Sequence, residues 1–468
     1  MKQLIVALIY TILLNIPVMA TIIRGENAEY AGKELRFYKY SDPVTREKVN
    51  LFSLKIDHRG NFITEVDIGH ISCFYCDFGI YRGIIILEPH ETTDLLLPPL
   101  REKSFTESKN PYFKPVEFWF LTSKEDHLNN KISKFDIELN RLTDKYFNIL
   151  YINQSKEIFD SIVAGLNNIF PSESNEIFEV HKKLKLKSVE ADAFRNSPYE
   201  MYEIFNSINP KYWNQPSFIE LFDKTYGNKL NLEYSLVSNK DIKQAASVAD
   251  IQFFLNITEA RYQLKNPIKF LALLKMLHDS FYTGQIPEKA ILKMISEDIF
   301  SGNSEHKIRT TSANLLKKLQ YLSPGTAAPV ICLKNINGEN ICTNRDNGKY
   351  KYLIFADTEM IICREQLKYL QKIEESFNDH LEIIAIIKKN DLIEMKIFLD
   401  KQKIPGMHLV DEKNLCSEKY QVMSFPQCFL LDKNHNVVFR QTKAPLDGFE
   451  HQFAVFIQKK LFEQKMSN

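Results

Sequence analysis

The sequence is poor in glycine, with 15 in 468 residues, and it has no glycine-rich loop of the kind that cradles phosphates. It also lacks the Gly-x-Ser-x-Gly elbow of α/β-hydrolases and the His-Glu-x-x-His helix of metalloproteases. An excess of charge is missing too, because 60 basic side chains are balanced by 59 acidic ones. Nothing therefore attracts the chain generally to nucleic acid. We expect no nucleotide or nucleic-acid partner, no metal site and no other cofactor.

Hydrophobic runs long enough to approach a membrane span are also scarce, and the one candidate lies at the N-terminus. Lys2 precedes the apolar run Leu4–Leu14, and Val18-Met19-Ala20 offers small residues at a cleavage site. The run has roughly 11 apolar residues, whereas a bilayer span needs roughly 20. We interpret residues 1–20 as a secretory signal peptide, with an uncleaved anchor as the alternative. No cysteine follows the cleavage site, so we expect no lipoprotein anchor.

Export would place the mature chain where disulfides persist. Because the number of cysteines is odd, at least one stays unpaired in a monomer, and spacing does not settle the connectivity. The seven cysteines are Cys73, Cys76, Cys332, Cys342, Cys363, Cys416 and Cys428.

Residues 21–104 show the alternating pattern of β-strands. In "LFSLKID" the side chains of Phe52, Leu54 and Ile56 share one face, and "FITEVDI" alternates again after a turn at "HRGN". Turns recur every eight to twelve residues or so. The pattern predicts a small antiparallel β-sandwich.

Residues 105–321 have the apolar spacing of helices instead. Leu128, Ile132, Phe135 and Leu139 recur at intervals of four and three, which places them along one stripe of a helix. Similar patterns follow, separated by proline-containing breaks. We predict an α-helical middle domain.

Residues 322–468 alternate strands and helices. "YKYLIFAD" and "LEIIAIIKK" are continuous apolar strands, whereas "CREQLKYLQKIEESF" and "DLIEMKIFLDKQ" have helical spacing. Strands of this kind separated by helices indicate a sheet covered on both faces. "QCFLLDKNHNVVFRQ" is predicted to close the sheet as a hairpin. The fold class is therefore multidomain α/β, with a β-sandwich, a helical domain and a C-terminal α/β/α domain.

The order of elements in residues 322–465 resembles the thioredoxin-like fold of exported bacterial thiol-disulfide oxidoreductases typified by the TlpA proteins. "PGTAAP" resembles the entry segment of that family, "GKYKYLIFAD" the strand leading to its active site, and "VMSFPQCFLLD" the segment that carries its cis-proline. "NPYF" and "LNNKI" further upstream resemble segments of its multidomain envelope members. The resemblance implies a periplasmic or envelope location in a bacterium, and it implies that Pro426, preceded by Phe425, is cis.

The family's active site is an aromatic residue followed by Cys-x-x-Cys at the start of a helix, where the helix dipole lowers the pKa of the first thiol. The second cysteine then resolves the mixed disulfide. The resemblance places Glu359, Met360, Ile361, Ile362 and Cys363 at these positions. A thioether has no proton to lose, so Met360 cannot be the nucleophile. Glu359 would raise the pKa of a nearby thiol, and the two isoleucines make the rim of the site apolar.

Cys363 has three interpretations: a small buried hydrophobic residue, one half of a disulfide, or a reactive single thiol. Peroxiredoxins, a related branch of the fold, carry Thr-x-x-Cys with one peroxidatic cysteine at this place. Here Met360 occupies the threonine position, and Thr358 comes two residues too early. The peroxidase interpretation therefore lacks the hydroxyl group that would position peroxide.

Two further cysteine pairs are candidate sites. Cys332 and Cys342 flank the turn at Asn337-Gly338 and would face each other across a hairpin in one register, as a structural disulfide. Cys73 and Cys76 lie on a predicted strand, where positions three apart point to opposite faces. For that pair, packing or a structural disulfide is favoured over a metal or redox site.

These features predict an exported envelope protein whose C-terminal domain has lost dithiol-disulfide exchange and binds a protein or peptide partner. The alternative is an enzyme, a single-thiol disulfide reductase or peroxidase that uses Cys363. The identity of the partner does not follow from the sequence.

Overall fold

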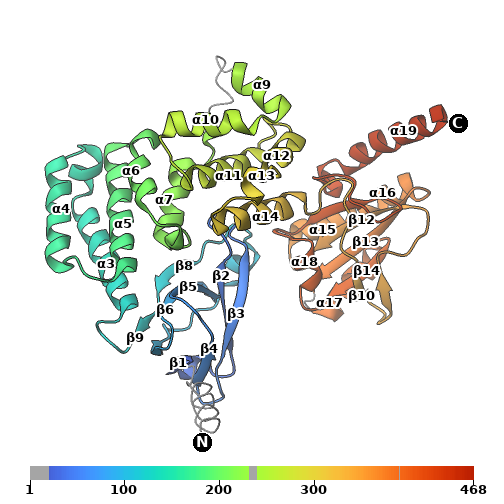
Figure 1. Cartoon of the computed structure of the whole chain (residues 1–468). Helices are drawn as coiled ribbons and strands as arrows, with labels where there is room; N and C mark the ends of the chain where they lie inside the picture. The colour runs from blue at the N-terminus through green and yellow to red at the C-terminus, as the bar shows by residue number, and fades with distance from the viewer. Residues whose placement is uncertain (1–19, 231–239, 389–390, 468) are drawn as a thin grey trace, which may run out of the picture. The chain divides into compact units, whose positions relative to one another are not determined.

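The computed structural model describes residues 20–230, 240–388 and 391–467 (Figure 1). The predicted signal peptide lies outside the described residues apart from Ala20. The chain divides into two compact units. Unit 1 comprises residues 1–103 and 114–319, and unit 2 comprises residues 104–113 and 320–468. The predicted β and helical domains thus fall in one unit, and residues 104–113 belong with the C-terminal domain.

The N-terminal part of unit 1 consists of two sheets. Their strand orders are β4-β1-β7-β9 and β3-β2-β5-β6-β8. The strands are β1 (Thr21–Glu26), β2 (Glu34–Tyr40), β3 (Lys48–Lys55), β4 (Asn61–Val66), β5 (Ser72–Phe78), β6 (Tyr81–Leu87), β7 (Thr92–Leu96), β8 (Val116–Trp119) and β9 (Leu121–Thr122).

One hydrophobic core joins these two sheets. Ile23 and Leu95 from the first sheet pack in the same buried cluster as Phe37 and Phe74 from the second. The prediction that the strands are all antiparallel was wrong, because β1 pairs with β7 in parallel and β6 pairs with β8 in parallel. Alternation of apolar residues reports which face of a strand is buried and carries no information on the direction of its neighbour.

Eleven described helices follow in unit 1, drawn from cyan to yellow in Figure 1. They are α3 (Leu128–Lys145), α4 (Lys156–Ile169), α5 (Glu176–Phe194), α6 (Tyr202–Ser207), α7 (Pro216–Tyr226), α9 (Lys240–Val248), α10 (Ile251–Tyr262), α11 (Ile268–Phe281), α12 (Glu288–Ile295), α13 (Asp298–Ser301) and α14 (His306–Gln320). Helix α3 coincides with the predicted stripe, since Leu128, Ile132, Phe135 and Leu139 are all buried.

The "LNNKI" segment connects the first of these helices to the sheets. The side-chain amide of Asn129 accepts a hydrogen bond from the N–H of Ile86 and donates one to its carbonyl, both at 2.8 Å. Asn130 makes the same pair of bonds with Thr122, again at 2.8 Å. A strand end that would otherwise keep a buried donor and acceptor unpaired is thereby satisfied. The motif therefore has a structural role.

Unit 2 contains a four-stranded sheet of order β14-β13-β12-β15, in which β15 is the antiparallel member. A short hairpin, β10 with β11, precedes it. The elements are α2 (Phe105–Lys109), β10 (Cys332–Lys334), β11 (Asn340–Cys342), β12 (Tyr350–Ala356), α15 (Ile361–Lys368), α16 (Leu370–Phe377), β13 (Leu381–Lys388), α17 (Leu392–Lys401), β14 (Met407–Asp411), α18 (Leu415–Lys419), β15 (Gln427–Leu431) and α19 (Phe449–Ser467).

Both faces of this sheet are buried. Tyr352 and Ile354 of β12 belong to one core cluster, whereas Leu353 and Phe355 belong to another. The predicted closing hairpin is incomplete, because after β15 the chain makes only isolated bridges such as Leu431 with Val437. None of the described helices combines the length and the apolar character that crossing a bilayer requires.

Candidate functional site

The active-site end of unit 2 is formed where β12 stops and α15 begins. The Asp357 carboxylate accepts a hydrogen bond from the N–H of Glu359 at 3.0 Å, which turns the chain sharply after the strand. Met360 is the residue that caps α15, with extended backbone angles and no side-chain hydrogen bond to the helix. A thioether is a weak acceptor, so it does not replace the Ser, Thr, Asp or Asn that usually stabilises this position.

Cys363 lies in the first turn of α15 with no exposed surface. Burial raises the pKa of its thiol to about 11, while a hydrogen bond with the backbone of Asp357 and the charge of Lys109 lower it by smaller amounts. Its thiol is free, so the disulfide interpretation of this cysteine does not describe the structure. The environment is that of a packed hydrophobic residue.

The two isoleucines do not bury this sulfur. Ile361 is 78% exposed and Ile362 is 51% exposed. Cys363 packs instead with side chains that project from β12 and from later turns of the helix, including Ile354 and Leu367. The expected apolar rim is therefore present, but it faces solvent.

A group of four charged side chains lies beside Met360. Asp357 has no exposed side-chain surface, and its carboxylate is 2.7 Å from the ammonium of Lys109 and 3.8 Å from that of Lys388. Lys109 also forms an ion pair with Glu359. Burial lowers the pKa of Lys109, but hydrogen bonds with the two carboxylates outweigh that effect and raise it above its ordinary value. The ammonium of Lys109 therefore keeps its charge in this setting.

Sequence reasoning gave Glu359 an adverse effect on a thiol and missed Asp357 and Lys109. A carboxyl group directly after a buried strand was the available signal at Asp357. No sequence signal pointed to Lys109, because this residue lies far from β12 in the chain, on a short helix in a segment interpreted as part of another domain.

The loop before β15 contains a cis peptide bond between Phe425 and Pro426. Phe425 packs against the cores on both faces of the sheet. Two residues after the proline, Cys428 is buried and accepts a hydrogen bond from the hydroxyl of Tyr352 at 3.2 Å. Burial raises the pKa of Cys428 to about 12, so this thiol is also protonated near neutral pH.

The remaining cysteine candidates are structural. Cys332 and Cys342 are directly opposite each other in β10 and β11 and form a disulfide. Cys76 packs in the core between the two sheets, whereas Cys73 packs against the core of the helices, so their sulfurs are on opposite faces of β5. Among the described residues, no group of histidine, cysteine and carboxylate side chains is arranged to hold a metal ion.

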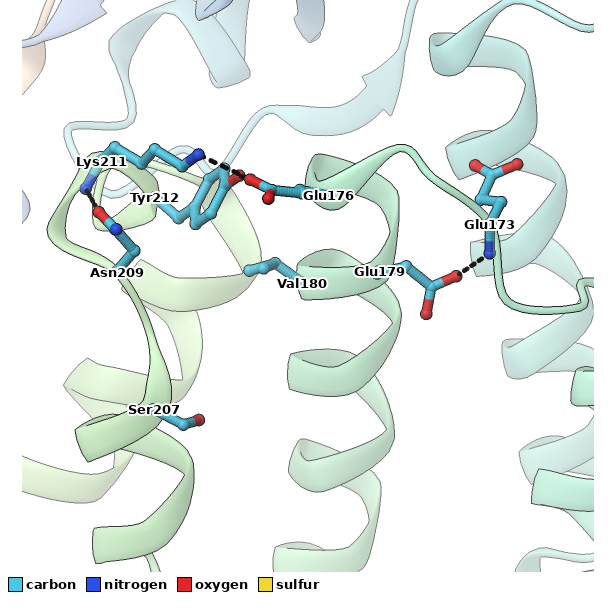
Figure 2. Close-up of a pocket in the computed structure, with 8 residues that line it drawn as sticks. All are labelled: Glu173, Glu176, Glu179, Val180, Ser207, Asn209, Lys211 and Tyr212. Carbon is cyan, nitrogen blue, oxygen red and sulfur yellow. Dashed lines mark hydrogen bonds and ion pairs between the residues drawn. The ribbon is translucent and has the colours of Figure 1, made fainter.

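Figure 2 shows a cavity of about 310 Å³ in unit 1. Its carboxylates already have partners: Glu176 is bound by Lys211 and Tyr212, and Glu179 accepts the N–H of Glu173 at 3.0 Å. It is lined by Glu173, Glu176, Glu179, Val180, Ser207, Asn209, Lys211 and Tyr212. Nothing in this arrangement indicates a reaction.

Known proteins similar to this chain match it within unit 2. Residues 324–440 match the model of the AhpC/TSA family. The C-terminal part of the chain is similar to TlpA-like thioredoxin-fold proteins. It is similar to the thioredoxin-like protein YneN of Bacillus subtilis, with 27% identity over 121 residues that span 25% of this chain and 70% of that protein.

A second curated protein and one solved structure are also similar to this part of the chain. The thiol-disulfide oxidoreductase ResA of Bacillus cereus is 26% identical over 130 residues, which span 27% of this chain and 75% of ResA. A thioredoxin domain of a thiol-disulfide oxidoreductase from Bacteroides vulgatus aligns in structure with 22% identity and a TM-score of 0.27, covering 29% of this chain and 97% of that one. The family match, residues 324–440, lies within unit 2.

Proposed function

We propose that this chain is an exported envelope protein whose thioredoxin-like domain no longer exchanges disulfides and instead binds a protein or peptide partner. One observation carries the proposal. Cys363, the only cysteine on α15, is fully buried with a pKa raised to about 11, and Met360 stands at the helix start where the family places its nucleophile. Thiol exchange needs an accessible thiolate, and this end of the domain offers none.

The binding role is supported by what the same end does expose. Ile361 and Ile362 present apolar surface to solvent at the start of α15, and Met360 packs against the same core cluster as Phe425 of the cis-proline loop. In thioredoxin-like folds, an extended peptide lies against that loop. The partner is thus a polypeptide with apolar side chains, and unit 1 with its two sheets and its helices adds further surface of unassigned role.

The proposal is tested by measuring insulin reduction and peroxide consumption by the purified full chain. We expect neither above the rate of buffer, before and after the change Cys363→Ser. Export is tested separately, by sequencing the N-terminus of the protein recovered from the periplasm, where the mature chain is expected to start at Thr21.

The second candidate function is that of a single-thiol reductase or peroxidase. It is favoured by the position of Cys363 in the first turn of a helix and by the positive charge of Lys109, which lowers the pKa of this thiol. Turnover that disappears with Cys363→Ser would establish this function and contradict the first.

A further inference from the structure

Residues 104–113 have the features of a ligand that the chain supplies to itself. They belong to unit 2, although the residues on both sides of them, Lys103 and Lys114, belong to unit 1. The segment is ordered locally by a capping box in which Ser104 and Glu107 bond to each other's backbone N–H. This box starts α2, and Lys109 lies in its last turn.

Little of this segment is buried. No residue of α2 is buried, and two of the three aromatic side chains are exposed, Phe105 at 63% and Tyr112 at 85%, while Phe113 is partly buried. The side chain of Lys109 is only 13% exposed. Its ammonium forms ion pairs with Asp357 and Glu359 at the active-site end.

The carboxylates of Asp357 and Glu359 form a binding site for a cation, which we call the socket. Asp357 is fully buried, and burying a carboxylate is costly unless an opposite charge and hydrogen bonds compensate it. Lys388 lies 3.8 Å from this carboxylate, beyond hydrogen-bond distance, whereas Lys109 lies at 2.7 Å. Glu359 is partly exposed and reaches the same ammonium from the solvent side.

The socket also gives Glu359 a role at a position where the family carries a different residue. The family carries an aromatic residue directly before its nucleophile, and this chain carries Glu359, whose carboxylate binds Lys109. The stretch that carries Met360 in place of the attacking thiol therefore also carries Glu359, which joins Asp357 in binding Lys109.

Resting on the proposed binding function, we propose that residues 104–113 are a resident intramolecular ligand of the active-site end of unit 2. Lys109 is the anchor and Asp357 with Glu359 is the socket. A protein partner at this end presents a lysine on a short, exposed, aromatic-flanked segment and takes the place of residues 104–113. The partner class is thus a lysine-bearing peptide.

The anchor is tested by hydrogen exchange with mass spectrometry on the full chain. Lys109→Met keeps the aliphatic stem and removes the charge, and Lys114→Met is the matched control at an exposed lysine nearby. We expect exchange of residues 105–113 to accelerate roughly tenfold or more in the first variant, equivalent to about 1.4 kcal/mol, and to stay unchanged in the second. Equal exchange in Lys109→Met and wild type would overturn the proposal.

A second variant separates the socket from a general effect of charge. Glu359→Gln should accelerate exchange of the same segment in the wild-type background and have no further effect once Lys109→Met is present. Additive effects of the two changes would contradict a shared contact. Glu359 has a side chain that is 39% exposed, and its change to glutamine leaves the pair of Lys109 with Asp357 in place.

The partner class is tested in trans with a labelled synthetic peptide of residues 104–113, added to the Lys109→Met chain. Saturable binding is expected, weakened at least tenfold when the peptide's own lysine is replaced by methionine. No binding, or equal binding by both peptides, would overturn the assignment of the socket to lysine-bearing partners. Insulin reduction by the wild-type chain would refute the proposed loss of exchange activity and would leave these results unaffected.

Discussion

Alkylation of Cys363 by iodoacetamide is predicted to be far slower in the folded chain than in the chain unfolded in urea. Folding raises the pKa of this thiol from an ordinary value of 9.0 to about 11. At pH 8 the thiolate fraction is then about one in a thousand, against about one in ten for the unfolded chain, a ratio of roughly 100. Because the sulfur has no exposed surface, iodoacetamide reaches it only after local unfolding of the structure. The alkylation rate in the unfolded chain should therefore exceed the rate in the folded chain by more than about 100-fold.

The assay quantifies the alkylated peptide that contains Cys363 by mass spectrometry over a series of times and pH values. Since the folded-state pKa is raised, the folded chain binds this proton more tightly than the unfolded chain, and stability falls as pH rises from about 9 towards 11. Rates are therefore compared below about pH 9, where the fold is intact. An apparent pKa at or below about 8.5, with a rate like that of a free thiol, would refute the reasoning.

Three further predictions concern stability, each measured by urea unfolding followed by circular dichroism. Asn129→Ala should lower the free energy of unfolding by about 2–4 kcal/mol, because it leaves a buried backbone donor and acceptor of β6 unpaired, and a loss below about 1 kcal/mol would contradict that role. Replacing Cys332 and Cys342 by serine should cost about 3 kcal/mol or less, because the disulfide closes a short loop with a separation of 10 residues. Burial lowers the pKa of His408 and His435, so the unfolded chain takes up protons first as pH falls below about 6.5, and unit 2 should lose stability there. A free energy of unfolding that stays constant in the wild type between about pH 7 and 5 would contradict this prediction. A pH profile that is unchanged by His408→Gln would also contradict it.

The thioredoxin-like unit was largely predictable because its central strands are continuous runs of apolar residues in the sequence. "YKYLIFAD" coincides with β12, and "LEIIAIIKK" coincides with β13. Its first helix was less predictable, since the pattern favoured one helix starting at Cys363. The structure has two, α15 and α16, which meet at Tyr369. Helical spacing continues across such a break, so sequence periodicity does not locate it.

Only the residues of the candidate site that belong to short sequence motifs were predictable. Met360 and Cys363 follow from the motif, as does Pro426. The ion pair of Lys109 with Asp357 joins residues 248 positions apart, and no local pattern encodes a contact across that distance. The burial of Cys363 was one of three open interpretations, because helix spacing alone does not say which face of a first turn meets the core.

Insulin reduction by the wild-type full chain beside the variant Met360→Cys tests the central claim most directly. The variant restores a Cys-x-x-Cys sequence at the start of α15, so any exchange activity it acquires is attributable to the missing sulfur. We predict no wild-type reduction above the buffer rate and a measurable rate for Met360→Cys. Wild-type turnover equal to that of the variant would contradict the claim that a thioether at this position has ended disulfide exchange.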